Sequence, residues 1–285
     1  ARFVKENYPE IGVLIGGNHA TFVADRLLSS EKNGGCIDIV VRGEGERAVE
    51  EILSGKNWKD IVGISYVDTC GKNFHNPHRV ELPIMDFPAR DYSLLDVADG
   101  VKSSDFNYYL QYVRGCNFQC KFCTNFSMWG GRIRPHGTEI FRKELYDVLE
   151  RQKDAPENQV ITLLDDNLFS APTYWKPIFS MLEEAVKQYP HARFAAQTRV
   201  SSIRDDTSNE MLAKARNVNI EIIFLGIESG SQRILDSMGK KCKVEWIERA
   251  CRNLKKHDIS VGAFWMVGYP GANIIEERRS LEVMR

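Results

Sequence analysis

Three closely spaced cysteines, Cys116, Cys120 and Cys123, are the residues of this chain best suited to chemistry. They follow an apolar segment, 108–113, and an Arg114-Gly115 pair that predicts a turn. Three thiolates at this spacing can bind three irons of a cubic 4Fe–4S cluster and leave the fourth iron without a protein ligand. Because an open metal position is where a substrate binds, the spacing favours a reactive centre over a purely structural one.

A structural zinc site is the main alternative. Such sites use four ligands, commonly arranged as two pairs along the sequence. No fourth Cys or His lies within ten residues of the three cysteines, and His136 is the nearest candidate. The other cysteines are scattered singly, at Cys36, Cys70, Cys242 and Cys251. The pattern therefore favours an iron–sulfur cluster over zinc.

Length and composition narrow the class of protein. The 285 residues suffice for one large or two modest domains. A formal net charge of −1 gives no basic excess, so a nucleic-acid surface is not expected. No stretch approaches the ~20 apolar residues of a membrane span, and no signal peptide is visible. Seven cysteines without a pairing pattern fit a reducing compartment, so we expect a cytoplasmic protein.

The amino-terminal part alternates short apolar runs with helical patterns. A strand at 11–15 ends in Gly16-Gly17, and a helix is predicted over 21–30. A second strand at 37–41 ends in the segment 42–46, and a second helix follows to about residue 53. Such alternation is typical of a parallel α/β sheet.

Residues 55–107 form a different region, which we interpret as a packed connector. The run 61–67, the turn 70–72 and Phe74 predict a small hairpin. Several prolines then interrupt any periodicity. Both ends of the chain have the pattern of incomplete helices, at 1–8 and 274–285, so we expect a fragment of a longer protein.

From residue 108 onward the alternation resumes for five units. The intervening helices are amphipathic, as the apolar spacing in 175–189 and 244–254 indicates. Successive βα units of this length fit a parallel barrel or a part of one. The five predicted strands lie near 108–113, 159–164, 193–198, 220–225 and 260–266.

Polar and glycine residues follow each of these strands. The carboxyl ends of barrel strands meet at one face, which is where active sites lie. Taken singly, residues 165–167 or 228–231 could be no more than helix caps, but five polar or glycine groups at one face favour a binding site. After the cysteine loop of the first strand, the groups are Asp165-Asp166-Asn167, Gln197-Thr198-Arg199, Gly226 with Glu228 and Ser229, and Gly268-Tyr269-Pro270-Gly271.

The C-x3-C-x2-C motif, with Phe122 before its last cysteine, resembles the signature of the radical S-adenosylmethionine (radical SAM) superfamily. The resemblance implies that Cys116, Cys120 and Cys123 hold a 4Fe–4S cluster and that Phe122 lies near the adenine of SAM. In that family the amino and carboxylate groups of SAM chelate the open iron. An electron from the reduced cluster then breaks the C–S bond and leaves a 5′-deoxyadenosyl radical.

The later motifs resemble the branch of this superfamily that also binds cobalamin. Residues 165–167 stand in the place of the family's Gly-Gly-Glu motif, which binds the methionyl amino group, although their sequence departs from it. Residues 226–231 resemble its fourth-strand motif, and 261–271 the fifth-strand motif that backs the adenine. A guanidinium such as that of Arg199 can pair with the SAM carboxylate. The expected SAM contacts are therefore Phe122, Asp165, Asp166, Asn167, Arg199, Glu228, Ser229 and Gly268.

The resemblance also predicts the domain organisation. Residues 1–54 are expected to be the carboxyl-terminal part of a Rossmann-like cobalamin-binding domain, 55–107 the connector, and 108–285 a partial (β/α) barrel of about five βα units. Glycines at strand ends suit close approach to a large ligand with a nucleotide tail. His19 is not expected to bind cobalt, because families with a histidine ligand place it after the first strand. The candidate cobalamin contacts are Gly16, Gly17, His19, Gly43, Glu44 and Gly45.

These features predict an enzyme that cleaves SAM reductively at a 4Fe–4S cluster. By resemblance, its reaction is cobalamin-dependent methyl transfer or an oxidative rearrangement at an unactivated carbon. Its expected partners are a small-molecule substrate and an electron donor such as flavodoxin or ferredoxin. Two other interpretations stay open from the residues themselves: an iron–sulfur electron carrier that does not cleave SAM, and a zinc-stabilised α/β domain.

Overall fold

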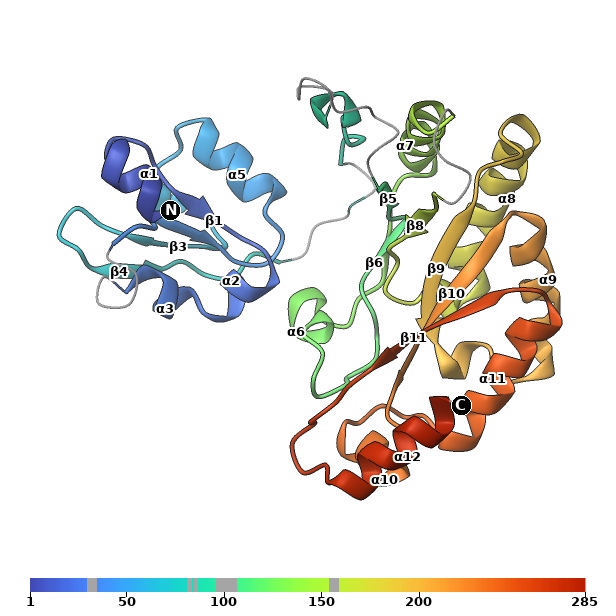
Figure 1. Ribbon diagram of the computed structural model, residues 1–285. Coiled ribbons are helices and arrows are strands. Elements are labelled where there is room, and N and C mark those ends of the chain that lie inside the picture. Colours follow the sequence, from blue (N-terminus) through green and yellow to red (C-terminus); the bar gives the residue numbers. More distant parts are fainter. Residues whose placement is uncertain (30–34, 81–83, 85–86, 96–106, 154–158, 285) are drawn as a thin grey trace. The chain divides into compact units, whose positions relative to one another are not determined.

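The computed structural model describes residues 1–29, 35–80, 84, 87–95, 107–153 and 159–284. Contacts within the chain divide it into two compact units (Figure 1). The first comprises Ala1–Leu82 with Ser127–Gly130, and the second comprises Pro83–Phe126 with Gly131–Arg285. Each unit has its own sheet and its own hydrophobic core.

The first unit contains a four-stranded sheet in the order β1-β2-β3-β4. The β1–β2 pair is parallel, whereas β3 and β4 add as an antiparallel hairpin next to β2. The elements of this unit are α1 (Arg2–Asn7), β1 (Leu14–Ile15), α2 (Asn18–Phe22), α3 (Ala24–Leu28), β2 (Ile39–Val41), α5 (Glu46–Leu53), β3 (Ile64–Val67) and β4 (Asn73–His75).

The alternation of side chains along β2 gives this sheet two buried faces. Ile39 and Val41 pack in a cluster with Ala48 of α5, whereas Val40 packs on the other face with Ala20 and Ala24 of α2 and α3. Figure 1 shows the helices divided in the same way, with α5 on one side of the sheet and α2 and α3 on the other. The result is the three-layer arrangement expected of an α/β unit.

Two details of this unit differ from the sequence interpretation. The helix expected over 21–30 begins at Asn18, and a break at Val23 divides it into α2 and α3. The predicted hairpin is present, but it joins the first sheet, because Tyr66 pairs with Ile39 and Val41 with Ile64. The antiparallel pairing completes a sheet that β1 and β2 alone would leave too narrow to bury two faces.

The second unit contains the five parallel strands predicted from the sequence, in the order β11-β10-β9-β8-β5. A two-stranded antiparallel ribbon, β6–β7, lies apart from them. The elements are β5 (Tyr109–Leu110), β6 (Val113–Arg114), β7 (Arg134–Pro135), α7 (Thr138–Arg151), β8 (Ile161–Leu163), α8 (Pro172–Gln188), β9 (Phe194–Arg199), α9 (Asn209–Asn217), β10 (Ile220–Glu228), α10 (Gln232–Ser237), α11 (Val244–Lys256), β11 (Ser260–Trp265) and α12 (Ile274–Met284). The helix α6 (Asn125–Trp129) begins in this unit, and its residues from Ser127 onward are grouped with the first unit.

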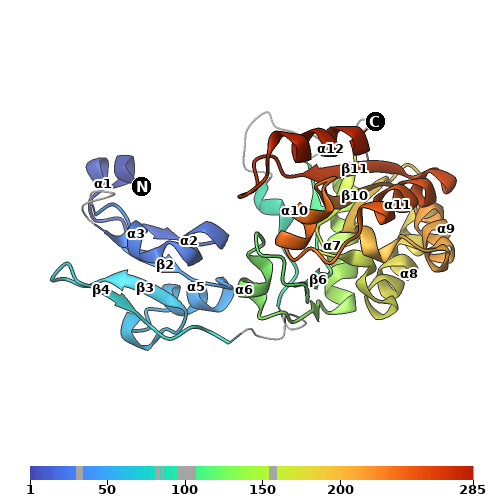
Figure 2. The same ribbon diagram turned by 90° about the horizontal axis from the view of Figure 1, so that it is seen from below.

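Helices cover one face of this sheet and bury its main core. Figures 1 and 2 show α8, α9 and α11 side by side along the sheet. Their apolar stripes meet alternate strand residues such as Phe194, Ile223 and Leu225, which are fully buried. The helices form here because their apolar residues recur at helical spacing and can be buried only against the strands.

The opposite face of the sheet is more open. Tyr109 and Phe264 on this face are each 47% exposed. An open face opposite the helices is the interior of a partial barrel, so the predicted fold class is confirmed. Strand register places the following residues on it: Tyr109, Thr162, Ala195, Gln197, Arg199, Ile222, Phe224, Gly226, Gly262 and Phe264. In the described part of the chain, no helix is both long enough and apolar enough to cross a membrane.

The loop after β10 is fixed against α12. The Gly230 N–H donates to Ser280 Oγ (2.9 Å), and Ser231 Oγ donates to Glu276 Oε1 (3.1 Å). A Cβ at Gly230 would lie 2.6 Å from the carbonyl oxygen of Arg279. The glycine is therefore required for the close approach of the α12 backbone.

We expect Gly230→Ala to destabilise the second unit by about 1–3 kcal/mol, because its methyl group collides with backbone atoms that cannot rotate away. Urea unfolding measures the change. Gly12→Ala is the control, since a Cβ at Gly12 meets nothing within 4 Å. Equal unfolding midpoints for the two variants would contradict this account of the packing.

Candidate functional site

The three cysteines lie on an irregular loop between β6 and α6. Cys120 is buried, whereas Cys116 and Cys123 are half-buried. The Cys123 N–H donates to the Cys120 carbonyl (3.0 Å), which turns the chain between these two thiols. Burial raises the pKa of the Cys116 and Cys123 thiols, so metal binding here must displace protons.

Two consecutive aspartates after β8 hold the chain that enters and leaves this loop. Asp165 accepts from the backbone N–H of Val113 (2.6 Å). Asp166 accepts from the N–H of Gly115 (3.0 Å) and from the side chain of Asn125 (2.5 Å). Because Gly115 precedes the first cysteine and Asn125 follows the last, one carboxylate fixes both ends of the loop. Burial raises the pKa of Asp166 as well.

Asn167 connects the end of β8 to the end of β9. Its side-chain oxygen accepts from Thr198 Oγ1 (2.7 Å), from the Arg199 N–H (3.3 Å) and from Ser202 Oγ (3.3 Å). The three residues 165–167 were predicted to contact SAM. In the structure, their side-chain oxygens accept hydrogen bonds from the cysteine loop and from the neighbouring strand ends. These residues therefore support the site structurally.

The segment that follows α10 packs against the middle of the cysteine loop. The Lys121 N–H donates to the Met238 carbonyl (2.8 Å). Gly239 has a φ of 64°, and a Cβ there would lie 3.4 Å from the carbonyl oxygen of Gln119. The loop is therefore supported along its length by the turn 238–240.

Arg199, at the end of β9, lies directly against this loop. It donates from Nη1 to Cys120 Sγ (3.2 Å) and from Nη2 to the Lys240 carbonyl oxygen. The centre of the Phe118 ring lies 3.6 Å from the guanidinium carbon of Arg199. The residue is 6% exposed, and its Nε has no hydrogen-bond acceptor among the described residues.

A buried ion pair lies beside the last cysteines. Lys240 Nζ donates to Glu228 Oε1 (2.7 Å) and lies 5.6 Å from the centre of the Phe122 ring. Glu228 has a φ of 70°, at a point where the pairing register between β10 and β11 shifts. A Cβ at Gly226 would lie 2.7 Å from Lys240 Nζ, so the glycine leaves room for the pair in its present position. The positive φ of Glu228 is a strained backbone conformation for a residue other than glycine, and such strain is concentrated at functional sites.

Two of the predicted SAM contacts lie toward α12 instead. Ser229 Oγ lies 3.4 Å from Ser280 Oγ, and it accepts from the Ser231 N–H (3.1 Å). Gly268 has a φ of 73°, and its N–H donates to Glu277 Oε1 (3.0 Å). The contacts of these two residues therefore hold α12 in place.

The donor set fits an iron–sulfur cluster. Thiolates are the usual ligands of such clusters, and N–H groups aimed at the sulfurs tune them. The loop offers three thiols, and a buried guanidinium donates to one of them. Within the described ranges, no three His, Cys, Asp or Glu side chains are gathered to hold a single metal ion. A cubane differs from such a site because it spreads its thiolates over separate irons.

Sequence reasoning did not identify three of the residues that complete this site: Phe118, Asn125 and Lys240. Phe118 and Asn125 stand inside and just after the cysteine motif, so their position was the available signal. Lys240 follows Gly239 at the end of a helix and has no distinguishing pattern in the sequence. Only the packing of its segment onto the loop gives it a role.

In the first unit, the candidate cobalamin residues lie at the carboxyl ends of the parallel strands β1 and β2. Gly16 and Gly17 follow β1, and Gly43 follows the parallel neighbour β2. The Gly43 N–H donates to Thr21 Oγ1 (3.0 Å), which joins the second loop to α2, the helix that follows the first loop. Gly17 and Gly43 both have positive φ, at 92° and 76°. The two remaining residues of the second loop, Glu44 and Gly45, and the exposed His19 complete this set.

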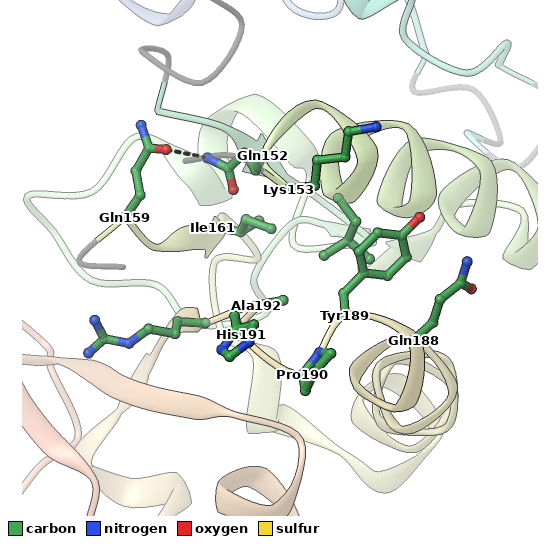
Figure 3. A pocket seen from close by; sticks show the side chains of 11 residues that line it. Gln152, Lys153, Gln159, Ile161, Gln188, Tyr189, Pro190, His191 and Ala192 are labelled. Atoms are coloured by element: carbon green, nitrogen blue, oxygen red, sulfur yellow. Dashed lines mark hydrogen bonds between the residues drawn. The ribbon is translucent and has the colours of Figure 1, made fainter. Parts of the chain in front are cut away.

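A separate hollow lies at the opposite end of the strands. It has a volume of about 460 Å³ and lies between the carboxyl ends of α7 and α8 and the starts of β8 and β9 (Figure 3). Gln152 and Gln159 are hydrogen-bonded across it (3.4 Å). Because the cysteine loop is held at the carboxyl ends of β8 and β9, this hollow does not belong to the candidate site.

Comparison with protein families gives the class of this site. The model of the radical SAM superfamily matches residues 110–283. The chain therefore belongs to the radical SAM superfamily, a family of enzymes that use a 4Fe–4S cluster and SAM.

Two curated relatives match almost the whole chain. The "Uncharacterized methyltransferase PH0819" of Pyrococcus horikoshii is 31% identical over 281 residues, which is 95% of this chain and 57% of the relative. The anaerobic magnesium-protoporphyrin IX monomethyl ester cyclase of Rubrivivax gelatinosus is 27% identical, over 94% of this chain and 47% of the relative. The chain thus spans about half the length of these relatives.

Solved structures share the fold. The cobalamin-dependent SAM radical enzyme OxsB, with aqua-cobalamin bound, matches 99% of this chain and 40% of its own, with a TM-score of 0.78 at 19% identity. The radical SAM methyltransferase TsrM of Kitasatospora setae matches 96% of this chain and 53% of its own, with a TM-score of 0.73 at 16% identity.

The buried Asp165 generates a pH prediction. Burial raises the pKa of its carboxyl from 3.8 to about 7. The folded chain therefore keeps a proton that the unfolded chain releases in this interval, and its free energy of unfolding falls as pH rises, by up to about 1.4 kcal/mol per pH unit. We expect Asp165→Asn to show a flatter dependence between about pH 4 and pH 7, measured by urea unfolding. The exposed Asp206→Asn serves as control, and a slope unchanged in Asp165→Asn would contradict the prediction.

Proposed function

We propose that this chain binds a 4Fe–4S cluster through Cys116, Cys120 and Cys123 and cleaves SAM reductively at its open iron. One observation carries the proposal: the ends of β8 and β9 and the turn after α10 all direct hydrogen bonds onto the cysteine loop. When bound and reduced by a donor of the flavodoxin or ferredoxin class, the cluster supplies the single electron that breaks a C–S bond of SAM.

The neighbouring ion pair supports a SAM site at this loop. SAM carries an ammonium and a carboxylate on its methionyl part, so it needs one acceptor and one cation. Glu228 and Lys240 offer these two groups in a buried setting beside Phe122. Charged hydrogen bonds in such a setting are strong because water does not compete. In this proposal Asp166 and Asn167 hold the cysteine loop and the end of β9 in position through their hydrogen bonds.

We further propose cobalamin-dependent methyl transfer to an unactivated carbon as the overall reaction. One relative and one structural neighbour are named as methyltransferases, and the structure of OxsB contains aqua-cobalamin. The glycine loops follow the carboxyl ends of the neighbouring parallel strands β1 and β2. This end of an α/β sheet is where nucleotide-like ligands bind. An oxidative ring closure is the second candidate, since another relative is named as a cyclase.

The cluster proposal is tested by anaerobic reconstitution with iron and sulfide, followed by SAM and a one-electron reductant. We expect 5′-deoxyadenosine with methionine, or S-adenosylhomocysteine if methyl transfer dominates. Cys120→Ala should reduce cluster absorbance and product to background because too few thiolates remain. Cys70→Ala, an exposed cysteine outside the loop, should behave like the wild type.

Other outcomes of the same experiment would identify the competing functions. A reduced cluster whose EPR spectrum does not change on addition of SAM indicates an electron carrier. Zinc in place of iron and sulfide after anaerobic purification indicates a structural metal domain. Either outcome in the wild-type chain would contradict the proposed function.

The cobalamin proposal is tested by retention of hydroxocobalamin after gel filtration, followed by its absorbance. Gly43→Val should abolish retention, because the new side chain occupies the space in front of the loop and disfavours its positive φ. Gly71→Val is a matched control, since Gly71 also has positive φ and open space around it. Equal retention by both variants, or none by the wild type, would contradict the proposal.

A further inference from the structure

The contacts of Arg199 distinguish it from a residue that holds the SAM carboxylate. A carboxylate is bound best by two parallel N–H groups of a guanidinium. Both terminal nitrogens of Arg199 are already used, one on Cys120 Sγ at 3.2 Å and one on the Lys240 carbonyl oxygen. Phe118 covers one flat side of the group at 3.6 Å. The guanidinium is thus held by two contacts to the cysteine loop and by one to the turn 238–240.

The charge of Arg199 is also not neutralised locally. Among the described residues, no carboxylate forms an ion pair with it. The nearby Lys240 differs, because Glu228 binds its ammonium at 2.7 Å. Arg199 is therefore a buried positive charge that donates a hydrogen bond to the sulfur of Cys120.

We propose that Arg199 sets the reduction potential of the iron–sulfur cluster by donating a charged hydrogen bond to Cys120. The inference rests on the proposed function. Reduction adds one electron to the cluster, so a fixed cation and an N–H···S bond stabilise the reduced form more than the oxidised form. Burial strengthens this effect because little water screens the charge. Arg199 makes the cluster easier to reduce for an electron donor of the flavodoxin or ferredoxin class.

The test is a redox titration of the reconstituted cluster, followed by EPR, in Arg199→Gln and Arg199→Lys. Arg199→Gln removes the charge, so we expect its midpoint potential to shift to more negative values. Arg199→Lys retains the charge and should lie between that variant and the wild type. Arg204→Gln is a matched control, because Arg204 stacks on Trp246 at 3.8 Å and pairs with Asp205 instead of bonding to a loop cysteine. Its midpoint potential should equal that of the wild type.

SAM affinity separates this role from carboxylate binding. If Arg199 held the SAM carboxylate, Arg199→Gln would lower SAM affinity by tenfold or more and leave the potential without SAM unchanged. That outcome would overturn the proposal. Failure of the wild-type chain to bind a cluster would instead overturn the proposed function.

A measurement on the wild type decides the matter even if Arg199→Gln fails to assemble a cluster. Protein labelled with ¹⁵N-arginine and reduced without SAM should show a nitrogen coupling to the cluster in pulsed EPR. Arg204→Gln should keep this coupling. Its absence from the labelled wild type would overturn the proposal, since no arginine nitrogen would then lie against a cluster sulfur.

Discussion

The irregular loop that carries the three closely spaced cysteines cannot support itself. It lies between a two-residue strand and a five-residue helix, so regular hydrogen bonding ends before the first cysteine and begins only after the last. Its backbone polar groups must find partners elsewhere or remain unsatisfied at a cost. The carboxylate of Asp166 and the carbonyl of Met238 supply such partners. The guanidinium of Arg199 adds a hydrogen bond to the sulfur of Cys120. The rest of the site depends on this constraint.

The same constraint explains why residues with ligand-like chemistry act here as supports. Asp165, Asp166 and Asn167 have the acidic and amide groups that a cofactor would attract. In the structure their oxygens accept from the protein itself. A buried carboxylate needs such donors because its desolvation is costly. Fixing the neighbouring loops and strand ends gives a pre-organised surface on which a cofactor loses little freedom when it binds.

Backbone strain in the second unit is placed next to this surface. Glu228 has a left-handed backbone conformation at the register shift of β10, and Gly226 leaves room for its partner Lys240. The strain is stabilised from the other side, where Ser231 and Gly230 are fixed to α12. The fourth-strand motif therefore has two tasks: one end faces the cysteine loop, and the other anchors a helix.

Local patterns in the sequence determined much of this protein. The cysteine spacing indicated the cofactor class. The repeated alternation of apolar strands and amphipathic helices predicted five parallel strands, and the structure confirms them. Such features depend on residues near each other in sequence, whose periodicity reports which face is buried. The place of the hairpin 64–75 was not visible in this way, because strand pairing between β2 and β3 is a contact between distant segments.

Only the tertiary structure decided what the individual polar residues do. Arg199 and Lys240 are separated by 41 positions, yet they share a hydrogen bond beside Cys120, which is 79 positions from Arg199. No local pattern reports that a buried guanidinium has two of its nitrogens in use or that Lys240 has found Glu228. The sequence by itself therefore determined the chemistry that was available, whereas packing decided which groups lie against the cysteine loop and which hold the fold. The physical reason is that a charged or polar group takes its role from the partners that burial brings within hydrogen-bond distance.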